Sequence, residues 1–176
     1  MRKGMGSSSS TSSGGGNEHT GKLYFDPLAD QPGDGYFITD AELRERLGQL
    51  VEASEKILEV RYYTNPLYGW QIWQNLLHHA YIVFETDQWW WSIEKNELGV
   101  TIQRSKNEAY VRDKFRRQDR TSDLFGNGIQ CEQKYKGSHT LQELIDHIYS
   151  KDYLNEEYNV VSNNCKDFAD KIYQFI

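Results

Sequence analysis

The sequence predicts an α+β domain in which an antiparallel sheet of four or more strands packs against helices. Two runs rich in aromatic and β-branched residues, 78–85 and 89–95, are separated by a short polar turn, which is the pattern of a β-hairpin. A third such run follows at 99–104. The end of the chain instead has apolar side chains at helical spacing after Asn164.

Length and composition favour one folded domain behind a tail. Residues 1–22 are mostly Ser, Gly and Thr, so we expect a disordered tail there and a single domain over 23–176. No run approaches 18 apolar residues, so no membrane-spanning segment is expected. The basic pair Arg2-Lys3 is not followed by the apolar run of a secretory signal. We therefore expect a cytoplasmic protein whose two cysteines are free thiols.

The segments before the hairpin are taken in order. Residues 23–27 predict an extended segment, and Thr39 with Glu42 forms a capping box that opens a helix over 40–58. The apolar stripe of this helix consists of Leu43, Leu47, Leu50, Val51, Ser54, Ile57 and Leu58. Residues 59–63 then form either a strand or the exit of the helix, and no pattern decides the structure of 70–77.

Fewer signals follow the third run. Residues 105–137 are mainly polar, although the alternation at 129–135 is consistent with one more strand. Residues 140–149 predict a helix with one apolar face, and 158–161 a short extended segment.

The last helix begins at Cys165, directly after Asn163 and Asn164, which are good N-cap residues. A helix N-terminus carries partial positive charge and unpaired N–H groups, and both favour a thiolate. Cys165 is therefore the candidate nucleophile, and its own N–H can serve an oxyanion hole. The alternative is a small buried side chain at a helix start.

A thiol nucleophile needs a base, and the pair His78-His79 opens the first strand of the hairpin. Alternation along a strand sends the two rings to opposite faces, so only one of them can face the thiol. We prefer His78, because the neighbouring Ala80 on its face leaves room for a helix end, and keep His79 as the alternative.

A third group must orient the imidazole. If the hairpin turns about Asp87, then Glu94 and Asn96 share a face with His78. Glu94 is the predicted orienting residue and Asn96 the alternative. A one-residue slip in register would remove this pairing.

These residues resemble those of a known group. His-x-Ala at a strand start, followed far downstream by Asn164-Cys165-Lys166-Asp167-Phe168 at a helix start, is similar to circularly permuted papain-like enzymes. That group includes the PPPDE peptidases and the lecithin:retinol acyltransferase-like and NlpC-type proteins. The resemblance implies a papain-like fold and a thiol hydrolase or acyl-transfer site. Acyltransferase-like members usually carry a second histidine on the following strand, where this chain has Ser92, Glu94 and Asn96.

The formal charge of −6 argues against a general nucleic-acid surface. One local basic stretch is an exception, and it reads either as a solvated loop or as a docking patch for an acidic partner or lipid headgroup. Its cations are Arg112, Lys114, Arg116, Arg117 and Arg120.

No CxxC or HExxH spacing is present, so we expect neither a metal nor a cofactor. The predicted function is thiol-dependent hydrolysis of a peptide, isopeptide or other amide or thioester bond. The alternatives are an acyltransferase that uses the same site on a lipid or acyl donor, and an inactive binding module of the same fold.

Overall fold

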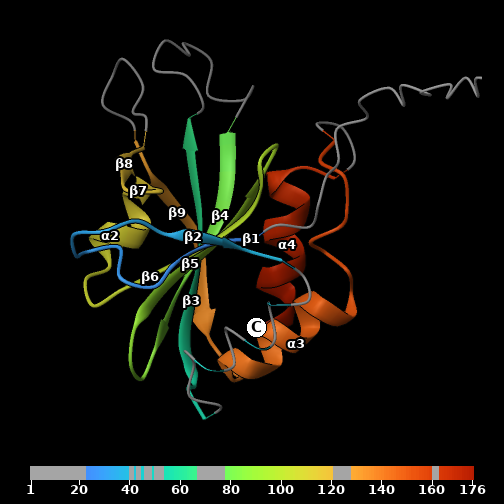
Figure 1. The fold of residues 1–176 in the computed structure, drawn as a ribbon, viewed down its shortest axis with the longest axis horizontal. Helices are drawn as coiled ribbons and strands as arrows, with labels where there is room; N and C mark the ends of the chain where they lie inside the picture. The colour runs from blue at the N-terminus through green and yellow to red at the C-terminus, as the bar shows by residue number, and fades with distance from the viewer. Residues whose placement is uncertain are drawn as a thin grey trace, which may run out of the picture.

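The computed structural model describes residues 23–39, 42, 45, 49, 54–66, 78–120, 128–159 and 163–176. Within them, a seven-stranded sheet has the order β2-β1-β6-β5-β4-β3-β9 (Figure 1). Its strands are β1 (Leu23–Asp26), β2 (Tyr36–Ile38), β3 (Ile57–Pro66), β4 (His78–Thr86), β5 (Trp90–Asn96), β6 (Gly99–Ser105) and β9 (Gln130–Lys136). All neighbours are antiparallel except β1 and β6, which are parallel. The chain is thus an α+β protein with a mixed, mostly antiparallel sheet.

The β4–β5 turn sets the register on which the site depends. Glu85 pairs with Trp90, and Ile82 with Ile93. The Thr86 N–H donates to the Trp89 carbonyl at 2.8 Å, and the Thr86 hydroxyl oxygen accepts from the Trp89 N–H at 2.8 Å. The same hydroxyl donates to the buried carboxylate of Glu55 at 2.6 Å. The turn is therefore held as a four-residue loop centred between Asp87 and Gln88.

Two helices pack on one face of the sheet. These are α3 (Leu141–Ser150) and α4 (Cys165–Phe175) (Figure 1). Their apolar stripes bury against the sheet because the side chains recur at helical spacing. The helix residues in this core include Leu141, Leu144, Ile145, Ile148, Phe168, Ala169 and Ile172, and the sheet residues include Ile82, Phe84, Trp91 and Ile93.

The other face is covered over part of its area by a short insertion. Helix α2 (Ala109–Arg112) precedes the small hairpin of β7 (Lys114–Phe115) and β8 (Gln118–Asp119) (Figure 1). Val111 from α2 is fully buried against Tyr63, Tyr81 and Val83. A second, smaller apolar cluster therefore holds the insertion against the strands that carry the site.

Most elements predicted from the sequence are present in the described residues. The runs at 78–85, 89–95 and 99–104 are β4, β5 and β6, and residues 140–149 fall on α3 with its capping box of Thr140 and Glu143. The segment 59–63 lies inside β3. The predicted strand 129–135 matches β9 to within one residue at each end.

The predicted helix over 40–58 extends too far. Ile57 and Leu58 belong to β3, where the Ile57 N–H donates to the His139 carbonyl at 3.0 Å. Glu42, Glu45 and Gln49 are helical, and the Thr39 N–H donates to the Glu42 carboxylate at 2.9 Å, as in a capping box. The rest of 40–53, the tail 1–22 and the segments 70–77 and 160–161 lie outside the described residues.

Candidate functional site

Cys165 is the first residue of α4, at the point where this helix meets the start of β4. The N-cap Asn164 accepts hydrogen bonds from the N–H groups of Lys166 and Asp167, and the Asp167 carboxylate accepts from the Asn164 N–H. This capping box fixes the first turn and holds Cys165 in place. The Cys165 Sγ lies 3.9 Å from the His78 carbonyl oxygen, so the thiol lies against the backbone of β4.

Cys165 is 6% exposed and has polar partners around its sulfur. Burial raises the pKa of the thiol, but hydrogen bonding with His79, the N–H of Ala80, the charge of His79 and the Tyr158 hydroxyl outweigh burial and lower the pKa below its usual value. The surroundings of the sulfur thus favour the thiolate, which is the nucleophilic form.

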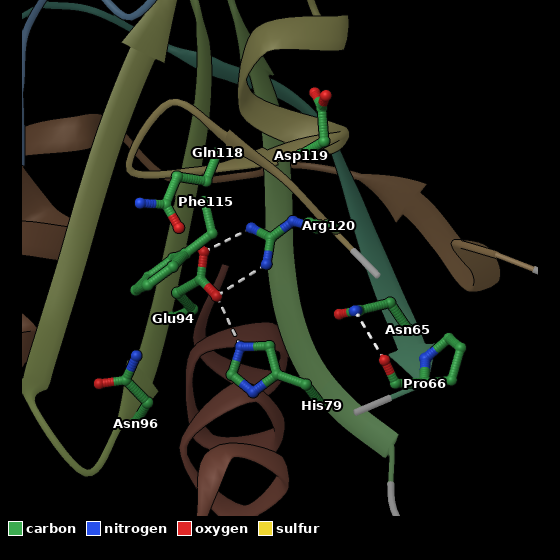
Figure 2. Close-up of a pocket in the computed structure, with 9 residues that line it drawn as sticks. All are labelled: Asn65, Pro66, His79, Glu94, Asn96, Phe115, Gln118, Asp119 and Arg120. Carbon is green, nitrogen blue, oxygen red and sulfur yellow. Dashed lines mark hydrogen bonds and ion pairs between the residues drawn. The ribbon is translucent and has the colours of Figure 1, made fainter. Parts of the chain in front are cut away.

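His79 is the histidine that meets this thiol. Its ring is largely buried, and Nε2 lies 2.6 Å from the Glu94 Oε2 (Figure 2). This contact leaves Nδ1 for the hydrogen bond with Cys165. The ring also stacks on Tyr81, with centroids 6.1 Å apart. Burial lowers the pKa of His79, but hydrogen bonds with Cys165 and Glu94 and their charges raise it to about 9. At neutral pH His79 is therefore charged, and it lies beside a thiol whose pKa is lowered.

Glu94 is held by two partners in the interior of the protein. Its carboxylate accepts from Arg120 Nη1 at 3.0 Å and Nη2 at 2.5 Å, in addition to the contact with His79 (Figure 2). The side chains of Arg120 and Glu94 are 3% and 1% exposed. Burial raises the pKa of Glu94, but the Arg120 charge and the hydrogen bonds of His79 and Arg120 lower it to about 2. The carboxylate is therefore ionised and fixed in orientation.

The preference for His78 over His79 is corrected by this geometry. The His78 side chain is exposed, whereas His79 lies on the face of Glu94 and Tyr81. The physical reason is the register. A turn centred on Asp87 would place Ala80 opposite Glu94, but the observed pairing of Ile82 with Ile93 shifts β4 by one residue and exchanges its faces.

Glu94 is the predicted orienting residue, and the structure places it beside His79 rather than His78. Asn96, the alternative, accepts a hydrogen bond from the Leu98 N–H at 2.8 Å in the β5–β6 turn. Asn96 also lines the pocket, but its amide oxygen is engaged in this turn, whereas His79 pairs with Glu94.

Two residues that contact this cluster were not placed there from the sequence, although Arg120 is among the cations of the basic stretch. Arg120 follows β8. Its guanidinium donates to the Glu94 carboxylate and lies 3.8 Å from the centre of the Tyr81 ring. Tyr158 precedes α4, and its hydroxyl interacts with the Cys165 sulfur. No local motif marks either residue, because each reaches its partner only through the tertiary fold.

The basic stretch is largely paired within the chain. Arg112 forms an ion pair with Asp113, Lys114 with Asp119, and Arg117 with the buried Asp26. Arg120 pairs with Glu94, and Arg116 donates to the Thr101 hydroxyl and covers the Tyr24 ring at 4.5 Å. These contacts hold the insertion against the sheet, and a docking role for an acidic partner stays a prediction.

Two hollows are lined by residues of β4 that adjoin the thiol. The first, of about 270 Å³, is lined by nine residues that include His79, Glu94 and Arg120 (Figure 2). The second, of about 530 Å³, is lined by residues that include His78, Ala80 and Lys166. The Cys165 sulfur contacts the His78 carbonyl oxygen and interacts with His79 and the Ala80 backbone, so it adjoins residues that line each hollow.

Cys131 differs from Cys165 in its surroundings. Both are free thiols, but Cys131 is exposed on β9. Among the described residues, no group of three or more His, Cys, Asp or Glu side chains is arranged to hold a metal ion. In the same part of the chain, no helix has the length and apolar character needed to cross a membrane.

Comparison with known proteins adds no identification to this geometry. No family model matches the chain, and neither the curated proteins nor the solved structures include a significant match.

Proposed function

We propose that the chain is a thiol-dependent hydrolase of papain-like type that cleaves an amide, isopeptide or thioester bond. The observation that carries the proposal is the continuous contact from Cys165 to His79 to Glu94, in which the pKa of the thiol is lowered and that of the imidazole is raised. A nucleophile, a base and a group that orients the base are the parts that cysteine catalysis requires.

The chemistry follows from these positions. The Cys165 thiolate attacks the substrate carbonyl carbon and forms a carbon–sulfur bond, and the carbonyl oxygen becomes an oxyanion. The Cys165 N–H at the start of α4 and the Tyr158 hydroxyl are the proposed donors to that charge, since the next two N–H groups of the helix already donate to Asn164. His79 then gives its proton to the leaving amine or thiol as the scissile bond breaks, which leaves a thioester on Cys165.

Hydrolysis of the thioester completes the cycle. Neutral His79 takes a proton from water, the resulting hydroxide attacks the thioester carbonyl, and the thiolate leaves with the acid as the product. Glu94 keeps the ring oriented and stabilises its charged form through both half-reactions. The order of a histidine strand before a cysteine helix, as in permuted papain-like enzymes, supports this assignment.

The test is capture of the thioester. A Cys131→Ser protein is mixed with dipeptidyl and fatty-acyl benzyl thioesters, and its mass is followed over time. We expect an acyl adduct on Cys165 that decays to free acid, and no adduct in Cys165→Ser or His79→Ala. Transfer of the acyl group to an added amine in preference to water would identify an acyltransferase. No adduct from any thioester would identify a binding module and refute the proposal.

A further inference from the structure

Asn65 lies in the hollow beside His79 and has no part in the chemistry described above. It is paired with His79 across β3 and β4, so the two side chains lie on the same face of the sheet. Figure 2 shows the Asn65 side chain extending from β3 toward the space between Arg120 and His79.

The orientation of the Asn65 amide follows from its one hydrogen bond. Nδ2 donates to the Pro66 carbonyl oxygen at 3.2 Å (Figure 2). A carbonyl oxygen only accepts, so the amide nitrogen must face Pro66 and the amide oxygen must face the hollow.

That oxygen lacks a partner. Asn65 is 6% exposed, and its buried Oδ1 accepts no hydrogen bond from any of the described residues. A buried acceptor without a donor destabilises the protein, and most such groups in folded proteins are paired. An acceptor left open in a pocket next to the base is therefore suited to a donor that arrives with a ligand.

We propose that Asn65 Oδ1 accepts a hydrogen bond from a main-chain N–H of the substrate. The inference rests on the proposed function and narrows its substrate class. A peptide or isopeptide presents an N–H group near the scissile carbonyl, whereas an ester or fatty-acyl thioester presents none. The Phe115 ring adds an apolar wall to the same hollow, whose volume of about 270 Å³ suits one residue-sized group.

The test compares two electrophiles on the same thiol in a Cys131→Ser background. The first is the most reactive member of a set of acetyl-dipeptidyl acyloxymethyl ketones, used with its derivative that is N-methylated at the residue next to the ketone. The second is methyl methanethiosulfonate, which has no N–H group and reports the thiolate alone. Rates of Cys165 modification are followed by intact mass.

We expect Asn65→Leu to slow modification of Cys165 by the parent ketone about tenfold, which corresponds to the loss of one hydrogen bond. The rate of modification by the thiosulfonate should not change. N-methylation should slow the wild-type reaction by a similar factor and have no further effect on Asn65→Leu. Asn65→Asp, which keeps the acceptor, should retain the parent rate within about threefold.

Equal effects of Asn65→Leu on the parent and N-methylated ketones would overturn the inference. So would an N-methylated ketone that reacts with wild-type protein as fast as its parent, a result that does not depend on any variant folding. Failure of every peptidyl ketone to modify Cys165 while the thiosulfonate reacts would also overturn it. Failure of the proposed function is seen separately, as a thiosulfonate rate that does not depend on His79.

Discussion

Breaking the buried ion pair of Arg120 and Glu94 should destabilise the protein strongly. In Arg120→Met, the carboxylate of Glu94 stays 1% exposed and loses its two guanidinium hydrogen bonds of 2.5 and 3.0 Å. Removal of one partner from a buried pair typically costs about 3–5 kcal/mol because the remaining charge loses its compensation, and here His79 would be left as the hydrogen-bond partner of the Glu94 carboxylate. We expect a loss of that size in the free energy of unfolding.

The chain offers a matched control at a similarly short distance. Lys114 and Asp119 are 2.6 Å apart, but the Asp119 side chain is 84% exposed. Exposed pairs contribute about 0–1 kcal/mol, so Lys114→Met should unfold almost like the wild type. The double variant Arg120→Met/Glu94→Gln has no uncompensated charge, and we expect it to be more stable than Arg120→Met.

The assay is urea unfolding followed by tryptophan fluorescence, for which the chain has five tryptophans. The double variant should also separate stability from reactivity, because it lacks the carboxylate that supports the charged form of His79. We expect its Cys165 alkylation at pH 6.5 to be about tenfold slower, which corresponds to one pKa unit. If Arg120→Met costs less than about 1 kcal/mol, the pair behaves like a surface pair and the reasoning is refuted.

Three further predictions concern pH, the turn and the oxyanion. The folded pKa of Glu94 is about 2, against 4.5 in the unfolded chain. Its contribution to the free energy of unfolding is therefore present above pH 4.5 and is lost as pH falls toward 2. His79 has a folded pKa of about 9, so its contribution to stability is complete below pH 6.5 and is lost as pH rises through 9. Because of both residues, the midpoint of urea unfolding should be highest between pH 4.5 and 6.5. Thr86→Val removes the hydroxyl that binds Glu55 and the Trp89 N–H, and it should lower the free energy of unfolding in urea by about 1–3 kcal/mol. The control Thr64→Val removes a hydroxyl whose contact is exposed, and it should unfold close to wild type. Tyr158→Phe should slow thioester formation on Cys165 at least about tenfold while urea stability changes little, and an unchanged rate would remove Tyr158 from the oxyanion assignment.

The elements that were predicted correctly depend on local patterns. The hairpin strands, α3 and the start of α4 follow from alternation, helical spacing and capping boxes, which are properties of neighbouring residues. Cys165 at a helix N-terminus and Glu94 on the adjacent strand could be proposed on the same basis.

What could not be predicted depends on contacts between distant segments. The choice between His78 and His79 follows from a one-residue difference in a turn that Glu55 anchors from 31 residues away. Arg120 meets Glu94 only because the insertion folds back over β5, and β1 pairs in parallel with the distant β6, Leu23 opposite Val100. None of these pairings leaves a periodic or capping signal in the sequence.

The central claim is that Cys165 and His79 form a thiolate–imidazolium pair. Its most direct test is the rate of Cys165 alkylation by iodoacetamide from pH 5 to 10 in a Cys131→Ser background, with His79→Ala and His78→Ala compared. The pair predicts reactivity that persists well below the usual thiol pKa in wild type and His78→Ala, and that disappears below about pH 8 in His79→Ala. Equal pH profiles for the two histidine variants would contradict it.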